Sequence, residues 1–184
     1  MPQSIDPEIN PPHPPPTFLA VPAHLLTPVL TLYRQGSADA SPCHCEIRFD
    51  GLTVEELDST ITLLARWFID YDPAVTSSTL VWQEETLDPN FQDVTRTTRD
   101  LQPFDFGADR AGIVQNGVHV VEVVVGESAG FDRNSTTLPH RAMLPGYVSA
   151  VYRFVVDVHL ETVAGLQCSQ VPPSQSPPTV RLCQ

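Results

Sequence analysis

Four stretches of the chain alternate apolar and polar residues with a period of two. This alternation is typical of strands that bury one face and leave the other in water. Weaker alternation marks two shorter stretches. In the segment before the first strong stretch, prolines leave room for an edge strand at most. The strong stretches are residues 43–50, 61–72, 117–126 and 148–161; the weaker ones are 80–83 and 101–106, and the edge strand is expected at 29–33. About seven strands over roughly 130 residues predict a single two-sheet antiparallel β-sandwich.

One segment fits two structures. Thr53 and Glu56 match a capping box, and apolar residues recur at helical spacing over residues 57–68. Residues 60–71 are nevertheless rich in β-branched and aromatic side chains, which favour a strand. We therefore expect a strand over 60–71 and at most a single helical turn over 53–58.

Proline gathers near the two ends of the chain. The run from Pro11 to Pro16, broken only by His13, forces an extended polyproline geometry that cannot join a helix or a central strand. A second proline-rich segment begins at Gln170. We expect three parts: a proline-rich arm over 1–28, a β-sandwich over 29–168, and a proline-rich tail over 169–184.

Four cysteines divide into an early pair and a late pair, Cys43 with Cys45 and Cys168 with Cys183. Because Cys43 and Cys45 share one face of a strand, a bond between them would be strained. We expect two long-range disulfides that pin the tail to this strand, with either pairing open. Disulfides persist in oxidising compartments, so the chain is interpreted as exported after removal of a targeting segment. The alternative is a cytosolic protein with four thiols.

The charge balance excludes several chemistries. The chain has ten arginines, no lysine and 22 acidic residues, giving a formal charge of −12. Without lysine there is no Schiff base and no phosphate-clamping lysine of a P-loop. The acidic surface also opposes binding to nucleic acid. We expect no nucleic-acid partner and no cofactor. Membrane attachment is expected only for a form that still carries a lipid anchor, which the given chain would have lost on processing.

Two stretches resemble a known kind of domain. ARWFIDYD at 65–72 resembles the central tryptophan strand of immunoglobulin-like domains, and GVHVVEVVVGES at 117–128 resembles a strand of bacterial PKD-type domains. With the proline-rich spacer, the pattern is similar to small exported lipoproteins of high-GC bacteria such as myxobacteria. The resemblance implies an Ig-like sandwich located in the periplasm, at the outer membrane or on the cell surface.

Residues Gly126 to Gly130 read GESAG and match the Gly-x-Ser-x-Gly elbow of serine hydrolases. In that interpretation Ser128 is the nucleophile, His140 or His159 the base, and Asp132 or Asp157 its acidic partner. The elbow requires a helix directly after the serine, and the following residues, rich in Asn, Ser, Thr, Pro and Gly, do not favour one. A polar turn is expected instead, and a small serine esterase remains the alternative.

A metal site is a second alternative. Asp70 and Asp72 share a strand face and carry the hard oxygen ligands that calcium prefers. A solvated acidic strand end explains the same two residues, so no metal is expected.

The segment 126–147 is long for a hairpin connection, and long loops on a rigid sandwich often bind partners. We therefore predict a non-enzymatic binding or structural module, for example an accessory subunit of an envelope or extracellular assembly with protein partners. The candidate binding residues all come from this loop: Phe131, Arg133, His140, Arg141 and Met143.

Overall fold

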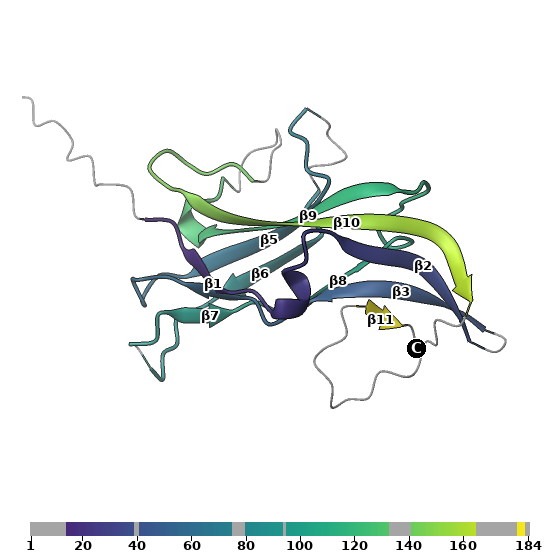
Figure 1. Ribbon diagram of the computed structural model, residues 1–184. Helices are drawn as coiled ribbons and strands as arrows, with labels where there is room; N and C mark the ends of the chain where they lie inside the picture. Colours follow the sequence, from purple (N-terminus) through teal and green to yellow (C-terminus); the bar gives the residue numbers. More distant parts are fainter. Residues whose placement is uncertain are drawn as a thin grey trace, which may run out of the picture.

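Five strands lie side by side in the larger layer of the structure, a computed structural model (Figure 1). It describes residues 14–38, 41–74, 80–93, 95–132, 141–164 and 180–182. In spatial order the strands are β2 (Leu30–Ala38), β10 (Ser149–Ala164), β9 (Gly117–Glu127), β5 (Leu63–Ile69) and β6 (Gln83–Leu87). Neighbours from β10 to β6 run antiparallel, whereas β2 runs parallel to β10, a departure from the antiparallel prediction.

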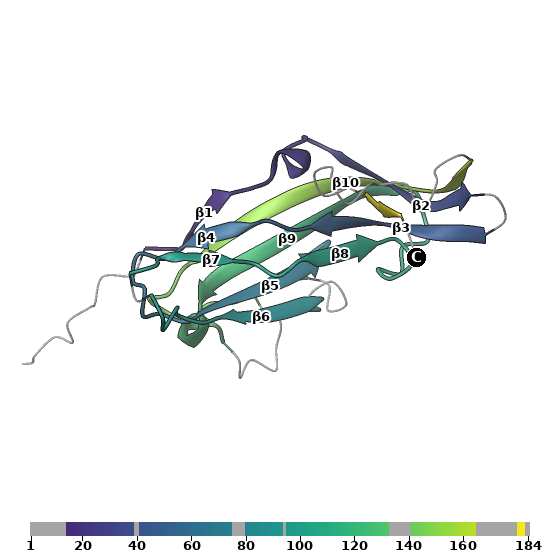
Figure 2. The same ribbon diagram turned by 90° about the horizontal axis from the view of Figure 1, so that it is seen from below.

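The second layer is built on two interrupted strands that pair with each other. β3 (Ser41–Phe49) is followed in line by β4 (Thr53–Glu55), and β7 (Thr98–Asp100) by β8 (Phe104–Gly107) (Figure 2). The register does not change across the break, because Phe49 pairs with Phe104 and Thr53 with Asp100. Two short strands complete this layer: β1 (Thr17–Ala20) beside β4, and β11 (Val180–Leu182) beside β3.

Strand β3 links the layers. Its first half pairs with β2 and its second half with β8, so hydrogen bonds are continuous from one layer to the other. The β3/β4 and β7/β8 strands face β5, β9 and β10 across a shared apolar core, which is a sandwich arrangement. The predicted all-β class is confirmed, and the two layers are consistent with a β-sandwich.

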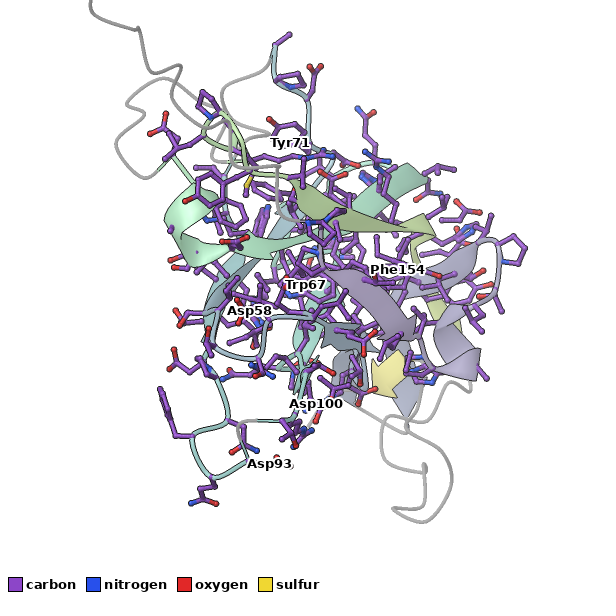
Figure 3. The ribbon with its side chains drawn as sticks, turned by 90° about the vertical axis from the view of Figure 1, so that its left-hand side faces the viewer. Asp58, Trp67, Tyr71, Asp93, Asp100 and Phe154 are labelled. Carbon is purple, nitrogen blue, oxygen red and sulfur yellow. The ribbon has the colours of Figure 1, made fainter. Side chains whose placement is uncertain are left out.

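The inner core lies between the two layers and follows the predicted alternation. Figure 3 shows Trp67 and Phe154 in this interior. Trp67 is fully buried and stacks on Phe104 with ring centroids 4.7 Å apart, and Phe49 lies 4.6 Å from Phe154. The rings of Phe49, Phe104 and Phe154 surround Trp67.

Several elements differ from expectation. Residues 53–55 form strand β4 where a single helical turn was considered. Val54 in this strand is fully buried and pairs with Phe18 on β1. Within the stretch interpreted as a spacer, β1 and the 3-10 turn η1 (Ala23–Leu25) pack on the sandwich, with Leu25 2% exposed. The strand expected at 80–83 instead begins at Gln83. No helix in the described ranges is long and apolar enough to cross a membrane.

Candidate functional site

The connection from β9 to β10 folds back over the outer face of the larger layer. It begins with the 3-10 turn η3 (Ser128–Gly130), and its two described ends, 128–132 and 141–148, pair with each other. Phe131 forms a β-bridge with Met143, and the Leu144 N–H donates to the Gly130 carbonyl at 2.7 Å. The loop therefore has an ordered base.

This base covers a second apolar cluster, which we call the outer cluster. Its buried members are Leu64, Phe68, Val124 and Phe131. Partly buried side chains surround them: Tyr71, Val81, Met143 and Val151. Leu64, Phe68 and Val124 occupy strand positions expected to face water. The prediction of one wet face for each strand is therefore wrong for β5, which is buried at all seven positions.

Charged groups fasten the loop to the sheet at Glu122, which is only 2% exposed. Its Oε1 accepts a hydrogen bond from Arg141 Nη1 at 2.6 Å, and its Oε2 accepts one from Arg153 Nε at 2.9 Å. The Arg141 guanidinium also lies 5.0 Å from the centre of the Tyr71 ring. Burial raises the pKa of the Tyr71 hydroxyl, while the nearby Arg141 charge lowers it by a smaller amount. Arg141 thus anchors the loop through both a carboxylate and a ring.

A second arginine, on strand β5, contacts the same loop. Arg66 on β5 donates through Nε to Glu84 Oε2 at 2.7 Å, and its guanidinium lies 4.8 Å from the centre of the Phe131 ring. Its side chain is only 7% exposed. The Phe131 ring is therefore held between apolar strand residues and a paired cation.

An open pocket of about 710 Å³ lies where this loop leaves the sheet. Residues 61–62 and 127–129 line it together with Phe131, Asp132 and Leu144. The Ser128 N–H donates to the Thr62 carbonyl at 2.9 Å, which ties η3 to the start of β5. We call this cavity the η3 pocket; its volume is within the range of ligand-binding pockets.

The two glycines of the GESAG motif have a packing explanation. A Cβ at Gly126 would lie 2.9 Å from Met143 Cε, and one at Gly130 would lie 2.5 Å from the Tyr147 ring. Neither position can carry a side chain without moving these neighbours. In the described ranges the only non-glycine residue with positive φ is Asp70, so Ser128 does not have the strained backbone of a nucleophile elbow.

The structure does not bring Ser128 and His159 together. Ser149 on β10 pairs with Gly126, and His159 lies ten residues further along the same strand, a separation on the order of 30 Å. The His159 ring lies tilted against the Tyr33 ring, with centroids 5.3 Å apart, and its Nε2 lies 3.1 Å from Asp157 Oδ2. Asp132 does line the same pocket as Ser128. The other candidate base, His140, lies outside the described residues.

Three of the five predicted binding residues meet at the loop base. Phe131 is buried, Met143 is partly buried, and Arg141 is paired with Glu122. All three contact the sheet. Arg133 and His140 lie outside the described residues. The remaining pocket-lining residues were not predicted, because only the fold brings residue 62 beside residues 127 and 144: they are Ile61, Thr62, Glu127, Ala129 and Leu144.

The two aspartates considered for a metal have other partners. Asp70, at φ +49°, accepts a hydrogen bond from the Val120 N–H at 2.8 Å, and its other carboxylate oxygen lies 2.6 Å from His119 Nδ1. Asp72 Oδ1 accepts from the Ala74 N–H at 2.8 Å. Among the described residues no group of three or more His, Cys, Asp or Glu side chains is arranged to hold a metal ion. Asp70 instead joins the end of β5 to the start of β9.

Cys45 is the one cysteine whose side chain belongs to the described part of the chain. Cys45 is 1% exposed in the inner core, and the register of β11 on β3 places Leu182 opposite it. Cys168, Cys183 and the side chain of Cys43 lie outside the described residues. The two disulfides stay a prediction, and the backbone of residues 180–182 lies beside the strand to which they would attach.

No protein-family model matches the chain, and a comparison with curated proteins finds no match. A function therefore has to be inferred from the geometry and chemistry of the η3 pocket and its loop.

Proposed function

We propose that the protein is a non-enzymatic binding module of an extracellular or cell-envelope assembly, and that a partner protein contacts it at the η3 pocket. The observation that carries this proposal is the ordered base of the β9–β10 loop. Arg141 and Phe131 hold it on a rigid sheet, and it lines an open cavity. A preorganised surface loses little conformational entropy on binding, which favours recognition.

Export is part of the same proposal. The position of β11 beside β3 supports a tail held near Cys45, as expected for a disulfide framework in an oxidising compartment. An accessory subunit whose sequence is proline-rich near both ends would suit such an assembly.

Site-specific photo-crosslinking tests the proposal. A photoreactive residue replaces Ala129, which is exposed on the rim of the pocket, and the same residue replaces exposed Glu161 on β10 as the matched control. In an extract of the native cell envelope we expect a discrete adduct from position 129 and none from position 161. Equal labelling from both positions, or none from either, would contradict a partner at this pocket.

A serine hydrolase is the second candidate, because Ser128 lines the same pocket as Asp132. A fluorophosphonate probe separates the two functions. We expect wild type and Ser128→Ala to label equally. Stronger labelling of the wild type would favour the hydrolase and count against a non-enzymatic module.

A further inference from the structure

We propose that the edge of β3 on which β11 lies also accepts this strand from a second copy of the chain. Two copies would then exchange their β11 strands and form a closed dimer. Exchange of this kind is independent of the η3 pocket, and it adds an interface between copies to the binding module proposed above.

One edge of β3 needs a strand beside it. β8 pairs with Glu46 and Ile47 from one side, so β11, which pairs with residues 45–47, lies on the other side (Figure 2). The pairs between β3 and β2 stop at His44. Without β11 the described structure leaves this stretch of backbone unpaired on that side, next to the buried side chains of Cys45 and Ile47. Unpaired backbone groups beside a core are costly, so this edge favours an added strand.

The residue types of β11 suit this edge. Its two apolar residues, at positions 180 and 182, lie opposite the two core residues of β3, and Arg181 lies opposite Glu46. Unlike charges at directly facing positions stabilise a strand pair, and like charges destabilise it. The edge therefore favours a short strand with an apolar, basic, apolar pattern, and every copy of the chain carries one.

The connection before β11 is longer than pairing within one chain requires. β10 ends at Ala164, which pairs with Ser37 near the tip of the β2–β3 hairpin. From this tip to Ile47, where β11 begins, the distance along β3 is on the order of 20 Å. Fifteen residues, 165–179, connect the two strands, and a chain of that length can extend to about 50 Å. β11 can therefore reach the β3 edge of a neighbouring copy as well as its own.

The composition of this connection favours exchange. It contains two Pro-Pro pairs, at 172–173 and 177–178. Because β11 runs antiparallel to β3, a chain that pairs with itself must turn back from the hairpin tip and reverse again before β11. Proline-rich sequences favour extended, stiff chains, which lowers the effective concentration of β11 at its own β3. A second copy offers the same edge, and reciprocal exchange fills both edges in a two-fold dimer.

Charge reversal at the facing pair separates exchange from pairing within one chain. Glu46→Arg places two arginines opposite each other, and Arg181→Glu places two glutamates, so each variant weakens its own β11–β3 pair. In a 1:1 mixture of the two full-length variants, exchange restores an unlike pair at both edges. Native mass spectrometry counts the dimers, with a reductant present so that no disulfide fixes either strand. We expect the mixed dimer to exceed each homodimer at least about tenfold, where random mixing gives about twofold.

Two controls carry the same charge changes. Glu161→Arg and Arg110→Glu alter exposed residues outside the β3–β11 pair, and their mixture should show no more than the random share of mixed dimer. The double variant, with both Glu46→Arg and Arg181→Glu, restores an unlike pair at the edge, and its dimer share should return to that of wild type. Circular dichroism establishes that each variant is folded.

A second variant leaves the sandwich unchanged. Serine replaces the four prolines at 172–173 and 177–178, which keeps the length of the connection and removes its stiffness. A flexible connection returns to its own β3 more readily. The dimer share, measured over a series of protein concentrations, should therefore fall severalfold below that of wild type.

Three results would overturn exchange: a wild type that stays monomeric as its concentration rises, a mixed dimer at only the random share, or an equal excess in the control mixture. An unchanged dimer share after the proline substitutions would also count against it. If Glu46→Arg does not fold, the concentration series and the proline variant decide. None of these results involves the η3 pocket, so the proposed function stands or falls separately, on the crosslink from position 129.

Discussion

Strand β5 contributes to two apolar clusters of different construction. On its inner face Ala65 and Trp67 belong to the core between the layers, whose members come from strands of both layers. On its outer face Leu64 and Phe68 belong to the outer cluster, to which the loop adds Phe131 and Met143. The inner core is closed by paired strands, and the outer cluster is closed by one loop.

This difference determines how each cluster responds when one of its side chains is removed by substitution. Inner-core side chains are shared by both layers, so losing one weakens the whole sandwich. The outer cluster is closed by the loop base, which can open while the strands stay paired. Local opening of this kind costs less than global unfolding. The inner core therefore sets the stability of the domain, and the outer cluster sets the shape of the η3 pocket.

The largest effect is expected from Trp67→Ala. The side chain is fully buried and stacks on Phe104, so its removal leaves a large cavity and should cost about 3–5 kcal/mol of unfolding free energy. Urea unfolding followed by circular dichroism measures the loss. Trp67→Phe should cost clearly less, since the buried Trp67 Nε1 has no hydrogen-bond partner to lose among the described residues. An alanine variant that is less destabilised than Phe131→Ala would reverse the proposed ranking of the two clusters.

Phe131→Ala should have a smaller and more local effect, about 2–3 kcal/mol, because the loop can relax where a core cannot. We expect faster hydrogen exchange at the Leu144 amide, which bonds to Gly130, before the strands exchange. Phe91→Ala is the matched control. That ring is 81% exposed, and its loss should change stability by less than about 0.5 kcal/mol. Uniform acceleration of exchange in all strands would show that the outer cluster is not a separate unit.

The inner core could be predicted from the sequence because period-two alternation reports directly which side chains share a face. Trp67 and Val121 were assigned inward on that basis and are fully buried. The order of the tryptophan strand and the valine-rich strand also indicated the sandwich class. The helical spacing around Leu57 did not produce a helix, since pairing with β1 and β7 stabilises residues 53–55 as a strand.

The outer cluster could not be predicted in the same way. Alternation places Leu64 and Phe68 on the face away from the core, and nothing local shows that a loop more than 60 residues later covers them. The anchors of the loop depend on partners distant in sequence, as in the pair of Arg141 with Glu122. The η3 pocket has the same origin, because it joins Thr62 to Glu127 and Asp132.

Two buried carboxylates, those of Glu122 and Glu85, have different surroundings. Glu122, on the outer face of the larger layer, pairs with two arginines. Glu85, on the inner face of β6 and 6% exposed, pairs with no arginine among the described side chains. Glu85 Oε2 accepts from the Gln102 N–H at 2.9 Å, and its Oε1 has no hydrogen-bond partner in the described part of the chain. Burial raises the pKa of Glu85 above its ordinary value of 4.5, and the Gln102 hydrogen bond opposes this rise by less.

The smallest predicted effect follows from this raised pKa. Between the ordinary and the raised value the folded state binds more protons at Glu85 than the unfolded state, so this group makes stability fall as pH rises from about 4.5. Asp93 contributes in the opposite sense, because hydrogen bonds from Thr95 lower its pKa and their stabilisation is lost as pH falls. The variant Glu85→Gln isolates the first contribution: its unfolding free energy, measured by urea titration from pH 4 to 7, should decline less with rising pH than that of wild type. Parallel profiles would mean that Glu85 is charged at no cost in the folded protein, and that the inner core tolerates a carboxylate as readily as the arginine-paired site around Glu122 does.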